Sequence, residues 1–103
     1  GLEALAESPY LENLELLNAN HNEIGDDGAI AIANTEKLPK LKDLSMFGNV
    51  IGDRGAQALA DSPYSKKYIK LDLYKNQYTR IGYKALTESE NLKNCEELEV
   101  YRE

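Results

Sequence analysis

The sequence predicts an α/β solenoid in which one strand-and-helix unit recurs every 27 residues. An asparagine, a glycine and several apolar residues return at this spacing, and no insertion interrupts them. Such a period is the signature of stacked repeats, because a single unit cannot bury its own apolar face. The columns that carry the register are Asn22, Asn49 and Asn76; Gly1, Gly28, Gly55 and Gly82; Leu17, Leu44, Leu71 and Leu98; and Ala19, Met46, Leu73 and Val100.

Strands are predicted immediately before each asparagine. In the clearest copy, Leu44 and Met46 alternate with polar neighbours, which is the pattern of a strand with one buried face. A third apolar column includes Leu41, three residues before Leu44. The register therefore predicts four parallel strands, near residues 15–20, 42–47, 69–74 and 96–101.

Helices are predicted after each asparagine. Ile-Gly-Asp at residues 51–53 is typical of a turn followed by a helix start. Small residues at 58–60 then favour a short helix that packs closely on its neighbours. Ser-Pro-Tyr at residues 8–10 and 62–64 is expected to end two of the helices, because proline stops a helix. The predicted order is one helix, three strand–helix pairs and a last strand.

The copy over residues 41–60 resembles the leucine-rich repeat, whose pattern is L-x-x-L-x-L-x-x-N-x-L. Its tail, I-G-D-x-G-A-x-A-L-A, is similar to the ribonuclease-inhibitor-like class, including its bacterial members. The resemblance covers the whole chain. It implies a right-handed superhelix with about four parallel strands on its concave face and helices on its convex face. It implies an architecture more firmly than a function.

Length and charge restrict the function. The 103 residues suit one small domain, taken as residues 1–103. A net charge of −6 argues against nucleic acid as a partner, since non-specific binding to its phosphates needs a basic surface. No apolar run approaches the roughly 18–20 residues that cross a bilayer, so no membrane partner is expected.

The two ends of the sequence lack a recognisable cap of the kind that solenoids need. We expect a fragment of a longer array, and the alternative is that the uncapped ends pair with another copy of the chain. Cys95 is the single cysteine and gives no sign of an oxidising compartment. The expected location is cytoplasmic, although a signal peptide could have been removed ahead of Gly1.

The concave face of the sheet is the predicted functional site. Residues between the apolar strand positions point to solvent there, and three aromatic side chains fall in one column, on strands about 4.8 Å apart. Aromatic and arginine side chains are favoured at interface hot spots. The alternative is that these rings only stack on one another to stabilise the sheet. The predicted partner-binding residues are Phe47, Tyr74, Tyr101, Lys70, Asp72, Lys75, Glu99 and Arg102.

No catalytic, cofactor or metal site is predicted. His21 is the only histidine, and the acids near it match no metal-ligand spacing, so it is interpreted as a surface residue. Cys95 falls in the apolar column of Leu41 and is expected in the core. The asparagine column is expected to be structural, because in the leucine-rich repeat this side chain bonds backbone groups at the bend after each strand. The nearby Asp26 and Asp27 are expected to favour the start of the helix that they begin.

The leading function is therefore a non-enzymatic interaction module that binds a protein or peptide on its concave sheet. Two alternatives remain open. The repeat class also resembles Ran GTPase-activating protein, which implies a regulatory solenoid that docks on a GTPase. The chain is otherwise a structural or assembly element.

Overall fold

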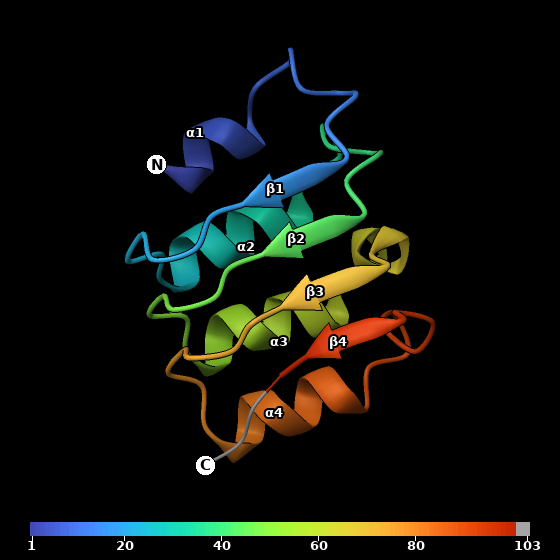
Figure 1. Cartoon of the computed structure of the whole chain (residues 1–103). Helices are drawn as coiled ribbons and strands as arrows, with labels where there is room; N and C mark the ends of the chain where they lie inside the picture. The colour runs from blue at the N-terminus through green and yellow to red at the C-terminus, as the bar shows by residue number, and fades with distance from the viewer. Residues whose placement is uncertain (101–103) are drawn as a thin grey trace.

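The computed structural model describes residues 1–100 and shows one parallel sheet with helices covering one of its faces (Figure 1). The four strands lie in the order β1-β2-β3-β4, each beside the next in sequence. The predicted order of elements is confirmed, and no helix in residues 1–100 is long and apolar enough to cross a membrane. The elements are α1 (Leu2–Ala6), β1 (Leu16–Asn18), α2 (Asp26–Asn34), β2 (Asp43–Ser45), α3 (Asp53–Asp61), the 3-10 helix η1 (Pro63–Lys67), β3 (Lys70–Asp72), α4 (Arg80–Thr87) and β4 (Glu97–Glu99).

The strands pair in the 27-residue register, but they are shorter than predicted. Each spans three residues instead of six, because the chain leaves the regular sheet as it bends toward the asparagine. Backbone pairing nevertheless continues past the strands. The N–H of His21 donates to the carbonyl of Phe47 at 2.9 Å, and the N–H of Gly48 donates to that of Tyr74 at 2.9 Å. The predicted aromatic column thus lies where the strands are still held side by side.

The core lies between the sheet and the helices. The predicted apolar strand positions and the leucine column of the helices supply its largest side chains. Each of these side chains is 0% exposed in the middle of the stack, so almost all of their apolar surface is removed from water on folding. They are Leu44, Met46, Leu71, Leu73, Ile32, Leu59 and Leu86.

The glycine column permits the helices to approach one another closely. A Cβ atom added to Gly55 would lie 2.9 Å from the Cβ of Ala29 on the preceding helix and 2.7 Å from the Cγ2 of Ile51. Gly82 meets Ala56 in the same way, at 3.0 Å. A larger residue at either position would push the two helices apart.

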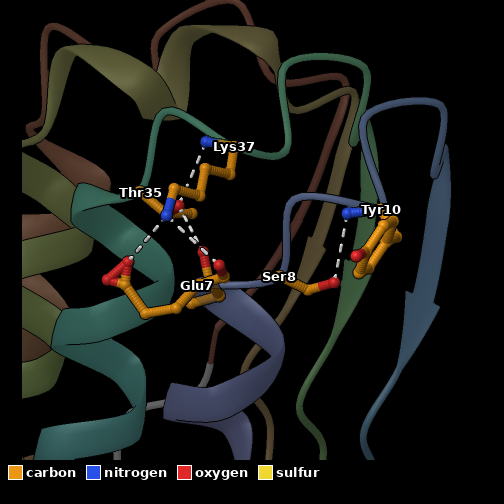
Figure 2. A network of polar contacts seen from close by, with 6 residues as sticks. Glu7, Ser8, Tyr10, Thr35 and Lys37 are labelled. Atoms are coloured by element: carbon orange, nitrogen blue, oxygen red, sulfur yellow. Dashed lines mark hydrogen bonds and ion pairs between the residues drawn. The ribbon is translucent and has the colours of Figure 1, made fainter.

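Hydroxyl groups link the end of each helix to the repeat before it. Thr35 Oγ1 donates to the carbonyl of Ala6 at 2.6 Å, and Ser62 and Ser89 make the same bond one and two repeats later. Figure 2 shows this contact beside the salt bridge between Lys37 and Glu7, at 3.5 Å. The serine of Ser-Pro-Tyr therefore ends α3 and also fastens it to α2.

We predict that Leu44→Ala destabilises the protein by roughly 2–5 kcal/mol, because the side chain is 0% exposed and its loss leaves a cavity. Leu16→Ala is the matched control. Leu16 lies on the adjacent strand β1 but is 59% exposed, so its truncation should cost less than about 1 kcal/mol. Urea unfolding followed by circular dichroism measures both. Equal costs would contradict the assignment of the two faces.

Candidate functional site

The open sheet face is the face that the helices leave uncovered (Figure 1). The strand residues that point away from the helices are mostly polar. Lys70 and Asp72 are half-buried on β3, and Glu99 is exposed on β4. Lys70 forms an ion pair with Glu97 on the neighbouring strand, at 3.7 Å. Both groups are partly exposed, so this pair contributes little stability and can exchange partners at low cost.

The aromatic column is partly exposed. Tyr74 is 36% exposed, and its backbone N–H donates to the carboxylate of Asp72 at 3.0 Å. The Phe47 ring is half-buried and meets the edge of the His21 ring, with 5.3 Å between centroids. His21 is exposed at the surface, as expected, and adds a second ring beside Phe47 from the turn after β1. Tyr101 and Arg102 lie outside the described residues.

The backbone around Phe47 is held by a side chain from the first repeat. Asn20 Oδ1 accepts from the N–H of Phe47 at 2.8 Å and from the hydroxyl of Ser45 at 2.7 Å. Lys75 continues this edge of the face, exposed and in the left-handed region at φ 60°. The structure therefore gathers Phe47, Tyr74 and Lys75 just beyond the carboxyl ends of β2 and β3, while Lys70 and Asp72 lie within β3 itself.

The asparagine column holds the bends that follow the carboxyl ends of the strands. Asn49 is 4% exposed, and its Oδ1 accepts from the N–H groups of Asn22 and Ile24 at 2.8 and 2.9 Å. Its Nδ2 donates to the carbonyls of Ala19 and Met46 at 3.0 and 2.9 Å. One side chain thus satisfies four backbone groups from two repeats, and the structural interpretation of this column is confirmed.

Aspartates at equivalent positions also join neighbouring repeats, a role that the sequence did not predict. Asp53 begins α3, yet its Oδ1 accepts from the N–H groups of Thr79 and Gly82, at the start of α4, both at 2.8 Å. The side-chain hydrogen bond from the Thr79 hydroxyl, helped by these two N–H groups, holds the pKa of the Asp53 carboxyl below its usual value despite the opposing effect of burial. Asp26 likewise bonds the start of α3, although it was expected to act on its own helix.

A shallow hollow on the sheet face was not predicted from the sequence. It lies at the amino ends of the strands, opposite to the aromatic column. It encloses about 320 Å³, and Leu16 and Ile69 line it together with Asp43 and Lys70. Leu16 is 59% exposed and Ile69 is 45% exposed. A signal was present, because both residues are aliphatic in columns that are otherwise charged.

Cys95 is less buried than expected. It packs against the core but remains half-buried, and its thiol lies 3.4 Å from the carbonyl of Ile69. Burial raises the pKa of the Cys95 thiol, which disfavours the nucleophilic thiolate. Within residues 1–100, no three of the His, Cys, Asp and Glu side chains come together in a way that could hold a metal ion.

This architecture defines the chain as a solenoid repeat protein of the α/β class. The family model for the leucine-rich repeat matches residues 10–33 and 37–60, which include β1 and β2 with their helices. These two segments are similar to the leucine-rich repeat, a family whose domains generally act in protein interaction and are typically non-catalytic. No curated protein matches the chain closely enough to indicate a relationship.

We predict that Asn49→Ala costs roughly 2–4 kcal/mol, because it leaves two buried carbonyls and two part-buried N–H groups without this partner. Asn22→Ala should cost less than about 1 kcal/mol, since Asn22 is exposed and donates to a single nearby carbonyl, that of Asn20. Chemical denaturation measures the difference. A similar cost at the two positions would show that the asparagine amide does not hold the repeats together.

We also predict that Asp53→Ala lowers stability by about 0.5–2 kcal/mol at neutral pH, by removing a cap from α4. The contribution of a carboxylate with a lowered pKa is present above its ordinary value of 3.8 and is lost as the pH falls through the folded-state pKa. The gap in melting temperature between wild type and variant should therefore close in acid. Asn34→Ala, at an exposed and uncharged position of α2, is the control, and its difference in melting temperature from wild type should not depend on pH.

Proposed function

We propose that this chain binds a protein or peptide on its open sheet face, in the manner of an interaction module without catalytic activity of its own. The observation that carries the proposal is that helices cover only one face of the sheet, while the other presents partly exposed aromatic and charged side chains in fixed register. Aromatic side chains supply contact area at low entropic cost, and the charged neighbours give direction to the contact.

The contact has two anchor points. Phe47 and Tyr74, with Lys75 beside them, form the first, at the carboxyl ends of the strands. Tyr101 and Arg102, which lie outside the described residues, are part of the proposal from the sequence alone. Leu16 and Ile69 line the hollow at the other edge and form the second. Asp72, Lys70 and Glu99 offer polar groups between them. A partner that spans both anchors runs along the strand direction.

The size of the face favours an extended segment over a broad surface. Four strands span only about 15 Å across, given a spacing of about 4.8 Å between neighbours. A standard protein interface buries about 800 Å² on each partner, which exceeds what this width offers. A peptide, or a loop of a folded protein, matches the described face. High affinity would require further repeats, in the longer array that we propose surrounds this chain.

We assign the chain to the ribonuclease-inhibitor-like class and to the cytoplasm as parts of the same proposal. The repeated I-G-D-x-G tail supports the class, and its glycine and aspartate have the packing and capping roles described above. The single free cysteine supports a reducing compartment.

The test is capture of a partner by wild type and by the Phe47→Ser/Tyr74→Ser variant. We expect the variant to remain folded by circular dichroism and to lose the partner, because its substitutions remove contact area from the face and leave the core intact. Tyr10→Ser/Tyr64→Ser is the matched control. Tyr10 is 88% exposed, in the connection between α1 and β1, and Tyr64 is 42% exposed, in η1.

Retention of the partner by the folded Phe47→Ser/Tyr74→Ser variant would remove the aromatic edge from the binding site. Equal loss by the control variant would show that capture depends on exposed aromatic side chains in general, and not on this face.

A further inference from the structure

The hollow on the open sheet face lies across the amino ends of the four strands, at the tails of the arrows in Figure 1. The first residue of every strand lines it, and the register of the sheet places these residues side by side. Their order across the sheet is Leu16, Asp43, Lys70 and Glu97. Backbone pairing holds them in this order, so their side chains leave the sheet from fixed positions.

The two lysines of the hollow are already paired. The ammonium group of Lys42 lies 3.2 Å from the carboxylate of Glu15. The ammonium group of Lys70 lies 3.7 Å from the carboxylate of Glu97 on β4. An acidic side chain from a partner would have to displace one of these glutamates to reach a lysine. The hollow therefore disfavours acidic side chains.

Asp43 is the carboxylate that these pairs leave over. It is half-buried, and within residues 1–100 its side chain takes part in no hydrogen bond or ion pair. Lys70 lies between Asp43 and Glu97 in the register, so its contact with one of these acids leaves the other without it. The lining holds three carboxylates and only two ammonium groups. The hollow thus carries one uncompensated negative charge at neutral pH.

Aliphatic side chains flank the Asp43 carboxylate. Leu16 is the register partner of Asp43 on β1 and is 59% exposed. Ile69 lies just before β3 and is 45% exposed. Long basic side chains bury their methylene stems along apolar surface of this kind, while the charged end stays in a polar environment. The hollow offers a surface for the stem and a carboxylate for the charged end.

We propose that the hollow is a subsite for an arginine or lysine side chain of the bound peptide. This assignment rests on the proposed function of the open sheet face and names the chemistry of the partner at its second anchor. The stem packs on Leu16 and Ile69, and the cationic end donates to the carboxylate of Asp43. Hydrogen bonds between charged groups are roughly twice as strong as neutral ones, and arginine can bond both carboxylate oxygens. A purely aliphatic side chain would bury Asp43 further without a partner, which is unfavourable.

The distance between the two anchors adds a spacing to this preference. Asp43 and Phe47 are four residues apart in the chain, which corresponds to roughly 13 Å of extended strand. An extended peptide covers the same distance in about four residues, and residues four apart lie on one face of it. The partner therefore carries its basic residue about four positions from the residue that contacts Phe47 and Tyr74.

The probe is a displayed library of random peptides of about ten residues, which are long enough to reach both anchors. It is selected on wild type, Asp43→Lys and Glu88→Lys at physiological ionic strength, which screens attraction between distant charges. Wild type should enrich arginine and lysine about four positions from an apolar residue, and Asp43→Lys should enrich aspartate and glutamate instead. Glu88→Lys is the matched control, because it makes the same change of net charge at an exposed position just after α4. Its peptides should keep the basic residue.

A selected peptide then separates the stem from the charge. Norleucine in place of the basic residue keeps an aliphatic side chain without a charge, and it should weaken binding to wild type about tenfold, as expected for the loss of a hydrogen bond between charged groups. Asp43→Asn should weaken the unmodified peptide by a similar factor. Norleucine should cause no further loss in Asp43→Asn, because the contact is already absent. Fluorescence anisotropy measures the affinities, and circular dichroism checks that each variant is folded.

Peptides without a basic residue, whose binding Phe47→Ser/Tyr74→Ser abolishes, would overturn the assignment of the hollow and leave the function of the face intact. A basic residue that persists in the peptides selected by Asp43→Lys would trace the preference to the net charge of the protein, and would overturn the assignment too. Independent losses from norleucine and Asp43→Asn would show that the two groups do not meet. Selection of no peptide by wild type would contradict the proposed function of the face itself.

Discussion

The side-chain amide of Asn49 is the contact on which the arrangement of the repeats most depends. A chain that leaves a parallel sheet and turns back toward a helix must carry N–H and C=O groups through a bend that water does not reach. Buried backbone groups of this kind require partners. Asn49 supplies them for its own repeat and for the one before, within 3.0 Å in each of four bonds. That one side chain holds the bend after β1 and ties it to the bend after β2.

Three kinds of hydrogen bond join neighbouring repeats, each at a different place in the strand-and-helix unit. The asparagine bonds the bend after the strand, an aspartate bonds the start of the next helix, and a serine or threonine bonds the end of the preceding helix. Each level joins a side chain to backbone, so it depends on the spacing of the repeats and not on the side chains of the neighbour. This explains how the apolar columns can vary between leucine, methionine and alanine while the stack keeps one register.

The sequence predicted most of the fold because a 27-residue period reports the fold directly. Leu44 and Leu71 are buried side by side as the columns required, and Gly55 and Gly82 each mark a close approach of two helices. The strand lengths were overestimated, since alternation of apolar and polar residues continues into the bend that Asn49 bonds. The candidate edge with Phe47 and Tyr74 was found because aromatic residues recur at the period.

Features that depend on a neighbouring repeat were not predictable from one copy. Asp53 begins its own helix, and only the stacked structure shows that its carboxylate bonds the helix after it. Cys95 shares a column with Leu41, yet it stays half-buried while Leu41 is 0% exposed. Position in the stack, and not residue type, decides the burial of such side chains. Leu17 and Leu44 differ for the same reason, since Leu17 is half-buried on β1 and Leu44 is 0% exposed on β2.

The polar columns also decide where binding can evolve. Because they fix the backbone from the bends and helix ends, the side chains on the open sheet face are not needed to hold the strands in place. Leu16 and Ile69 are therefore informative. The equivalent positions in the other repeats hold charged residues. The fold gains little stability from aliphatic side chains that are 59% and 45% exposed. Exposed apolar surface also lowers solubility. An aliphatic pair at such positions is more simply explained by contact with a partner than by stabilisation of the sheet.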